Sequence, residues 1–138
     1  MLPRDDPSRR LVAQRIRNRI IEHLQLTASF DDQLQLQSDV PFVRVPAEVI
    51  NGWEDWMPGD PRLLEFAEGV YTPEEVVAII AFHDVWDSVA DRTPDPLPSL
   101  RETQALPEWR DLRDSARQAL AVLLERGPFP DDIEIGLD

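Results

Sequence analysis

Apolar residues recur along the chain with the three-to-four-residue spacing of amphipathic helices. The first such pattern covers residues 8–37 and contains Val12, Ile16, Ile20, Leu24, Phe30 and Leu34. It predicts either one long helix or two helices that separate near residues 27–29. In the second case, Ser29 would cap the second helix and Asp32 would occupy its third position. The pattern leaves both alternatives open.

Proline and glycine punctuate the middle of the chain. Residues 40–46 contain two prolines and three valines, which predicts an extended crossing segment, or a short strand with no evident partner. Residues 47–57 place five apolar side chains on one helical face. We therefore prefer a helix to the hairpin that Asn51-Gly52 would also allow, with Gly52 pointing away from that face. A further short helix is expected from residue 60 to Gly69.

The clearest helix start is Thr72-Pro-Glu-Glu75, where Thr72 caps, Pro73 takes the first turn and Glu75 completes a capping box. This helix is expected to reach about Asp91 and to form the centre of the core. Its apolar face includes Ile79, Phe82 and Trp86, and its polar side is marked by Asp84, Asp87, Ser88 and Asp91.

The last helix is predicted over residues 107–126, because Pro107 opens it and Gly127 and Pro128 follow it. A proline-rich link over residues 93–106 precedes this helix. The fold class is therefore all-α: a single-domain helical bundle of three long and about two short helices with a proline-rich crossover. We expect residues 1–127 to form this domain and residues 128–138 to form an acidic tail. The tail is expected to be mobile, although Ile133, Ile135 and Leu137 could dock.

Charge narrows the range of partners. The 138 residues include 27 Asp and Glu against 14 basic residues, all of them Arg, which gives a net charge of −13. A strongly acidic chain argues against nucleic acid and anionic membranes as partners. The chain contains no cysteine, which excludes disulfides and thiolate metal ligands. With no apolar span, no secretory signal and no lysine, we expect a protein of the bacterial cytoplasm.

The charge is uneven along the chain. Residues 1–26 hold six Arg and three acids, for a net of +3, whereas residues 27–138 hold eight Arg and 24 acids, for a net of −16. One interpretation is a basic arm for nucleic acid or an acidic partner. The other is a first helix that lies against the protein's own acidic body. We favour the second, because the arginines point in several directions on a helical projection.

The two histidines, His23 and His83, both fall on apolar helical faces, and Asp87 follows His83 by one helical turn. They could meet in the core and hold a ligand or a metal, and His83 could serve as a general base oriented by Asp87. The spacing matches no metal-binding motif. We therefore favour buried histidines with structural partners and expect no metal and no cofactor.

Tryptophan is the other candidate for a binding site. Trp53 and Trp56 share one helical face, and Trp86 and Trp109 lie on the apolar faces of later helices. Such residues could line a pocket or anchor an interface. Their positions on apolar stripes favour the core instead.

The chain contains no nucleophile elbow and no glycine-rich phosphate loop. We therefore favour a non-catalytic, acidic protein-interaction domain that binds a basic protein partner in a regulatory, assembly or immunity-like role. The alternative is a small helical enzyme or ligand-binding protein, whose pocket between helices would be lined by His23, His83, Asp87, Trp53, Trp56 and Trp86. A third hypothesis is a homodimer formed through the first helix, with Leu11, Ile21 and Leu36 outside its main stripe.

Overall fold

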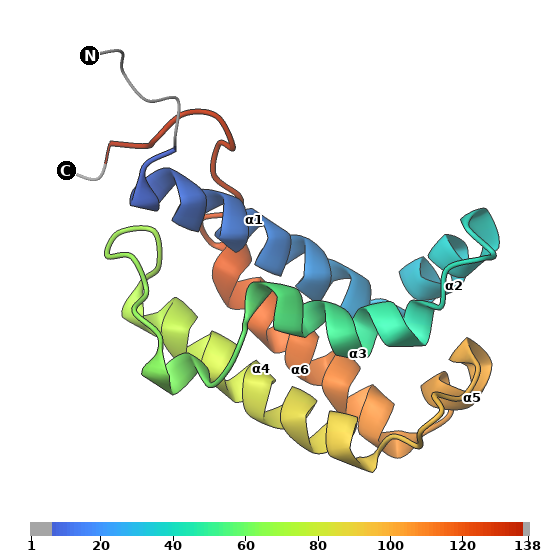
Figure 1. Ribbon diagram of the computed structural model, residues 1–138. Helices are drawn as coiled ribbons and strands as arrows, with labels where there is room; N and C mark the ends of the chain where they lie inside the picture. The colour runs from blue at the N-terminus through green and yellow to red at the C-terminus, as the bar shows by residue number, and fades with distance from the viewer. Residues whose placement is uncertain (1–6, 137–138) are drawn as a thin grey trace.

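A computed structural model describes residues 7–136 of the chain, and within these residues the regular structure is helical (Figure 1). The helices are α1 (Arg9–Thr27), α2 (Phe30–Asp39), α3 (Val45–Trp56), the 3₁₀ turn η1 (Pro61–Leu63), α4 (Pro73–Arg92), α5 (Leu100–Gln104) and α6 (Pro107–Leu124). The prediction of an all-α single domain with a proline-containing crossover is confirmed. No strand occurs among the residues described, where β pairing is limited to an isolated bridge between Glu68 and Tyr71.

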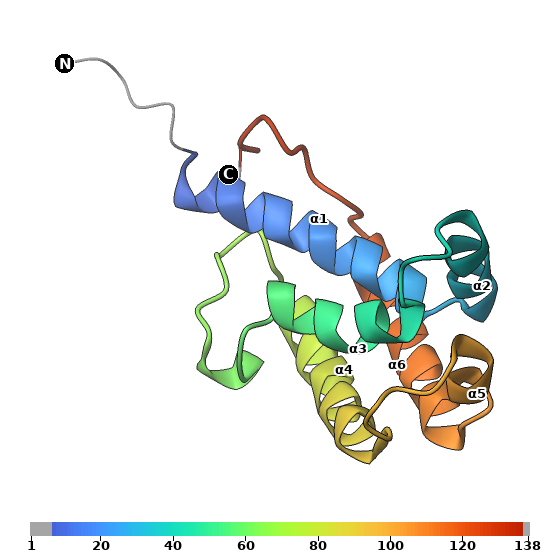
Figure 2. The ribbon, with the colours of Figure 1, turned by 45° about the vertical axis from the view of Figure 1, so that its right-hand side comes forward.

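Helix α6 runs through the middle of the bundle and packs against both α1 and α4, while α3 packs on α1. The short helices α2 and α5 lie side by side at one end (Figures 1 and 2). The largest fully buried side chains include Trp53 from α3, Phe82 from α4 and Trp109 from α6. The core is therefore one apolar cluster that all four larger helices share.

The first apolar pattern forms two helices that separate at Ala28 and Ser29. The hydroxyl of Ser29 accepts a hydrogen bond from the backbone N–H of Asp32 at 3.0 Å. The buried side chain of Gln33 donates to the carbonyls of Leu26 and Thr27 at the end of α1. These bonds satisfy backbone groups that a helix end leaves unpaired, which stabilises the break.

The start of α3 and the conformation of the segment before it differ from expectation. Helix α3 begins at Val45 rather than residue 47, and the segment before it forms a turn, with Val43 N–H bonded to the carbonyl of Val40 at 3.0 Å. The side-chain amide of Gln37 holds this turn, because it donates to the carbonyl of Val43 and accepts from Val45 N–H at 3.3 Å. Residues 40–46 are therefore not a continuous extended crossing.

The predicted helix over residues 60–69 is wrong beyond its first turn. Only Pro61–Leu63 is helical, and Leu64 has an extended backbone. The extended chain brings the ring of Phe66 edge-on to Tyr71, with 5.1 Å between centroids. Leu63 remains 84% exposed. Packing of Phe66 therefore outweighs the local helical preference of this apolar stretch.

Helices α4 and α6 match their predictions closely. Both bonds of the Thr72–Glu75 capping box are present, and Gly127 has φ of +74° just after α6. The five-residue helix α5 was not expected within the proline-rich link. It begins with a second capping box between Ser99 and Glu102, a signal present in the sequence.

The segment over residues 128–136 is docked on α1 rather than free. Two buried amide side chains of α1 hold it: Gln14 donates to the carbonyls of Pro130 and Ile133, and Asn18 both donates to and accepts from the backbone of Phe129. Ile133, an expected anchor, is 69% exposed. Leu137 lies outside the residues described. The polar amides of α1, together with the ring of Phe129 packed against the core, therefore fix this segment.

Candidate functional site

Trp53 links the two histidines of the chain. Its fully buried indole packs against the imidazole of His23, with 5.8 Å between ring centroids, and its Nε1–H donates to Nδ1 of His83 at 3.1 Å. The predicted site residues on α1, α3 and α4 are therefore joined through one indole. The contact between the histidines is indirect, because each touches a different part of Trp53.

His23 is a buried, neutral core residue. Burial lowers its pKa to about 4, against a smaller opposing effect from a hydrogen bond to the backbone of Val49. Its Nε2 is buried and has no hydrogen-bond partner among the described residues. Gly52 lies directly against the ring, because a Cβ at residue 52 would stand 3.3 Å from Cε1 of His23. Gly52 therefore does not point away from the packed face of α3, contrary to expectation.

His83 is half-buried and lines an open cleft of about 540 Å³ between the end of α3 and the middle of α4. The same cleft is lined by Trp86 and by three carboxylates, Glu54, Asp60 and Asp87. We call it the acidic cleft. Its lining side chains come from three separate segments of the chain, so sequence spacing alone could identify only the α4 members.

The hydrogen bonding of His83 differs from the prediction that Asp87 orients its ring. Asp87 shares the cleft, but the bond recorded for the imidazole is the one from Trp53. Since Nδ1 accepts this bond, the proton of the neutral ring is on Nε2. A neutral imidazole in this tautomer has no free lone pair with which to act as a general base.

Arg62 is the basic residue beside the acidic cleft, and its guanidinium is already paired with carboxylates of the chain. Its guanidinium forms ion pairs with Asp84 and with Asp60. The hydrogen bond from Arg62 holds the pKa of Asp84 below its ordinary value. Glu54 and Asp87 have no ion pair among the described residues. The cleft therefore keeps an excess of negative charge.

The remaining tryptophans serve different parts of the structure. Trp86 Nε1–H donates to the carbonyl of Ile50 at 2.8 Å, which ties α4 to α3. Trp109 donates to the hydroxyl of Thr93 at 3.1 Å in the core. Trp56 is half-buried and lines a second pocket, described below. The six predicted residues therefore do not form one enclosed pocket between helices.

The sequence analysis did not single out Arg17, which is the most buried charged side chain among the described residues. Arg17 is fully buried and forms a two-bond pair with Glu75 at 2.8 and 2.9 Å. It also donates to the carbonyls of Val70, Leu123 and Gly127. Burial opposes ionisation of Glu75, but hydrogen bonds from Arg126 and Arg17 hold its pKa below the ordinary value. This network joins α1, α4 and the end of α6.

Three further arginines of α1 also contact acids or carbonyls of the same chain. Arg19 pairs with Asp131 at 2.8 Å, Arg10 lies 3.6 Å from Glu134, and Arg15 donates to the carbonyl of Asp131 at 2.7 Å. The interpretation of α1 as a helix held against the protein's own acids is confirmed for these residues. Ile21, expected outside the main stripe, is 2% exposed and packs within the chain's own core.

Within residues 7–136, no group of three or more His, Asp or Glu side chains is arranged to hold a metal ion. No helix in that range is long and apolar enough to cross a membrane. Comparison with protein-family models, with curated proteins and with solved structures finds no match.

Proposed function

We propose that this chain is a non-catalytic binding domain for a basic protein partner, and that the acidic cleft receives arginine or lysine side chains of that partner. The observation that carries the proposal is the composition of the cleft. Glu54, Asp60 and Asp87 line the same space of about 540 Å³ as His83 and the largely buried Trp86.

This combination suits a cationic side chain. The face of an indole attracts an ammonium or guanidinium group, and a carboxylate beside the ring adds a charge-assisted hydrogen bond. A planar guanidinium suits such a site better than an ammonium, because it can donate to more than one carboxylate and lie against the part of Trp86 that lines the cleft. We therefore expect arginine to bind more tightly than lysine.

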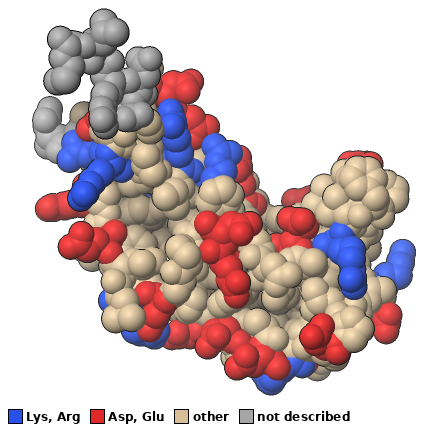
Figure 3. Space-filling view, in the orientation of Figure 1, with Lys and Arg blue, Asp and Glu red and all other residues tan. Residues whose placement is uncertain are grey.

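The distribution of charge supports the same proposal. Arg10, Arg17 and Arg19 of α1 are paired with acids of the same chain, and most of the other acids remain on other surfaces. Figure 3 shows Asp and Glu side chains spread over the face that carries α3 and α4, while Arg side chains lie at the start of α1, near α2 and α5, and along the lower edge. Such a field attracts a basic partner and raises its rate of association at low salt.

The chemistry of the imidazole favours binding over catalysis. The histidine in the cleft accepts the hydrogen bond of Trp53 through Nδ1, so its neutral form offers a donor rather than a base. A donor of this kind can orient a carbonyl of the partner's backbone beside the bound cation.

The proposal is tested with a nona-arginine peptide and two variants of equal net charge. The cleft variant carries Glu54→Gln, Asp60→Asn and Asp87→Asn, and the control carries Asp31→Asn, Asp111→Asn and Glu125→Gln. All three control positions are exposed and lie away from the cleft. We expect the cleft variant to lose several times more affinity than the control at low salt. Equal losses, or no binding by the unaltered protein, would contradict the proposal.

A further inference from the structure

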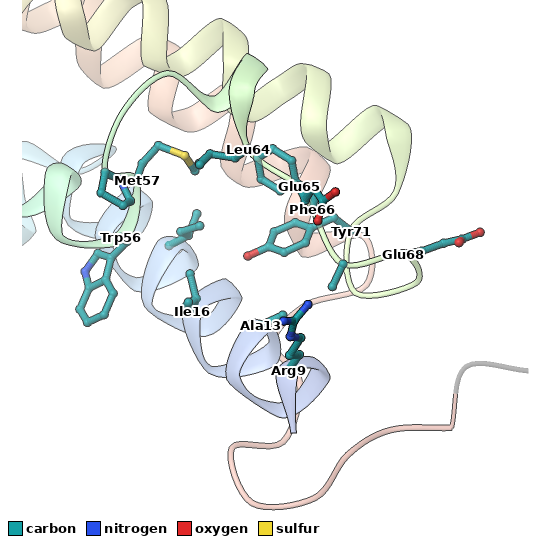
Figure 4. A pocket seen from close by; sticks show the side chains of 13 residues that line it. Arg9, Ala13, Ile16, Trp56, Met57, Leu64, Glu65, Phe66, Glu68 and Tyr71 are labelled. Atoms are coloured by element: carbon teal, nitrogen blue, oxygen red, sulfur yellow. The ribbon is translucent and has the colours of Figure 1, made fainter. Parts of the chain in front are cut away.

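The largest pocket described lies on the other side of Met57 from the acidic cleft. It has a volume of about 750 Å³ and runs along α1, where Ala13, Ile16 and Ile20 form one wall. The opposite wall comes from residues 56–71, including Trp56 and Phe66 (Figure 4). We propose that this pocket binds a neutral, largely apolar small molecule that presents one oxygen to the hydroxyl of Tyr71.

Tyr71 supplies the polar group of the pocket. The residue is only 8% exposed, and its hydroxyl makes no hydrogen bond with the described part of the chain. Figure 4 shows the hydroxyl pointing into the pocket towards α1. The hydroxyl oxygen itself is open to the pocket. A molecule that fills the pocket can therefore supply its hydrogen-bond partner.

The ring of Tyr71 is held in a fixed position. Phe66 packs edge-on against it, and the guanidinium of Arg17 lies 5.9 Å from the ring centroid on the core side. Burial raises the pKa of Tyr71 above its ordinary value, so the hydroxyl keeps its proton and acts as a donor. A carbonyl or hydroxyl oxygen is the matching acceptor.

The surroundings of this hydroxyl determine the charge of the ligand. The walls around it are aliphatic and aromatic. A charged group beside them would lose its hydration and gain only one hydrogen bond in return. Charged residues line the pocket as well: Glu65, Glu68 and Arg9, two acids against one base. An anionic ligand therefore gains little there. The volume falls within the range of small-molecule sites, which are mostly apolar with a few fixed polar groups.

This site is separate from the binding of a basic partner proposed above. Met57 and Pro58 line both cavities, but the carboxylates of the acidic cleft do not line this pocket. A variant with an altered Tyr71 therefore leaves the acidic cleft intact. The two proposals can fail independently.

The test uses prodan, a neutral naphthalene ketone whose fluorescence shifts to the blue in apolar surroundings. Titration is carried out on the unaltered protein and on Tyr71→Phe, Ala13→Trp and Ala121→Trp. Phenylalanine removes only the hydroxyl, tryptophan at residue 13 fills the pocket, and Ala121 is a matched control on the exposed side of α6. Circular dichroism and thermal unfolding establish that each variant is folded.

We expect prodan to bind one to one, with affinity lowered about two- to tenfold in Tyr71→Phe, the range that one neutral hydrogen bond contributes. Binding should be lost in Ala13→Trp and unchanged in Ala121→Trp. Decanol should displace prodan at lower concentration than decanoate. The proposal is overturned by absence of a blue shift, by equal affinity in Tyr71→Phe, or by decanoate displacing prodan more readily than decanol.

Discussion

The indole N–H of Trp53 donates a hydrogen bond to Nδ1 of His83 across 3.1 Å. This bond fixes the tautomer of the histidine in the acidic cleft. His23, on the other side of the same indole, has the opposite arrangement. Its Nε2 has no partner, so the hydrogen bond to the backbone of Val49 uses Nδ1. One tryptophan thus separates two histidines with different protonated nitrogens.

The first prediction follows from this difference. In the neutral form of each ring, His83 should be protonated on Nε2 and His23 on Nδ1. Long-range nitrogen–proton correlation spectra distinguish the two tautomers directly. The same tautomer in both rings would contradict this assignment, and with it the argument that His83 is a donor in the cleft.

A second prediction concerns the pH dependence of stability through His23. The folded-state pKa is lowered to about 4 from an ordinary value of 6.5. The unfolded chain therefore binds more protons between these values, so the free energy of unfolding falls as the pH drops from about 6.5 to about 4. The loss from this group is up to about 3 kcal/mol.

Urea unfolding at several pH values checks this effect by comparing the unaltered protein with His23→Gln. Glutamine keeps a donor for the backbone of Val49 and cannot titrate. The variant should therefore lose less stability across the same pH range, even if its stability at neutral pH is lower. Parallel pH profiles would show that His23 is not the group responsible.

A third prediction tests the close packing of Gly52 against His23. Gly→Ala within a helix normally stabilises by about 1 kcal/mol. Here the added Cβ would stand 3.3 Å from Cε1 of a buried imidazole that has little room to move. Gly52→Ala should therefore give no gain in the unaltered chain, but should give one in a His23→Ala background. Additive effects of the two substitutions in thermal unfolding would rule out the contact.

A fourth prediction concerns the buried pair between Arg17 and Glu75. Arg17→Met should lower the free energy of unfolding by about 3–5 kcal/mol, because it breaks a buried ion pair and removes one donor from each of three carbonyls. Glu75 then keeps Arg126 as its cationic partner. The matched control is Arg62→Gln, which breaks an exposed ion pair and should have a far smaller effect. Similar losses in the two variants would show that burial does not decide the strength of these pairs.

Local signals predicted the helices well where caps and periodicity agreed. The capping box at Thr72 and the glycine after α6 mark real helix ends. The capping box at Ser99 also marks a real helix start, but we predicted a link there because three prolines directly precede it. Residues 60–69 were misassigned, because the position of Phe66 depends on Tyr71 rather than on local preference.

The candidate site was predictable only in part. Periodicity placed His23, His83 and the tryptophans on packed faces, and the two histidines do pack against Trp53 and Trp86. Periodicity does not specify the relative rotation and height of α1, α3 and α4, which decide which groups meet. Glu54 and Asp60 join His83 only through this packing. The local pattern likewise does not single out Gln14, whose role depends on the distant residues 130–135 that it binds.

The most direct test of the proposed function is where a basic peptide binds. We would record amide and indole chemical-shift changes of the isotope-labelled protein as nona-arginine is added at low salt. The proposal predicts that the largest changes fall on residues 54–60 and 83–87, around Trp86, and that high salt reverses them. Changes spread evenly over exposed acids such as Asp31, Asp111 and Glu125 would contradict a specific acidic cleft and leave only nonspecific attraction by net charge.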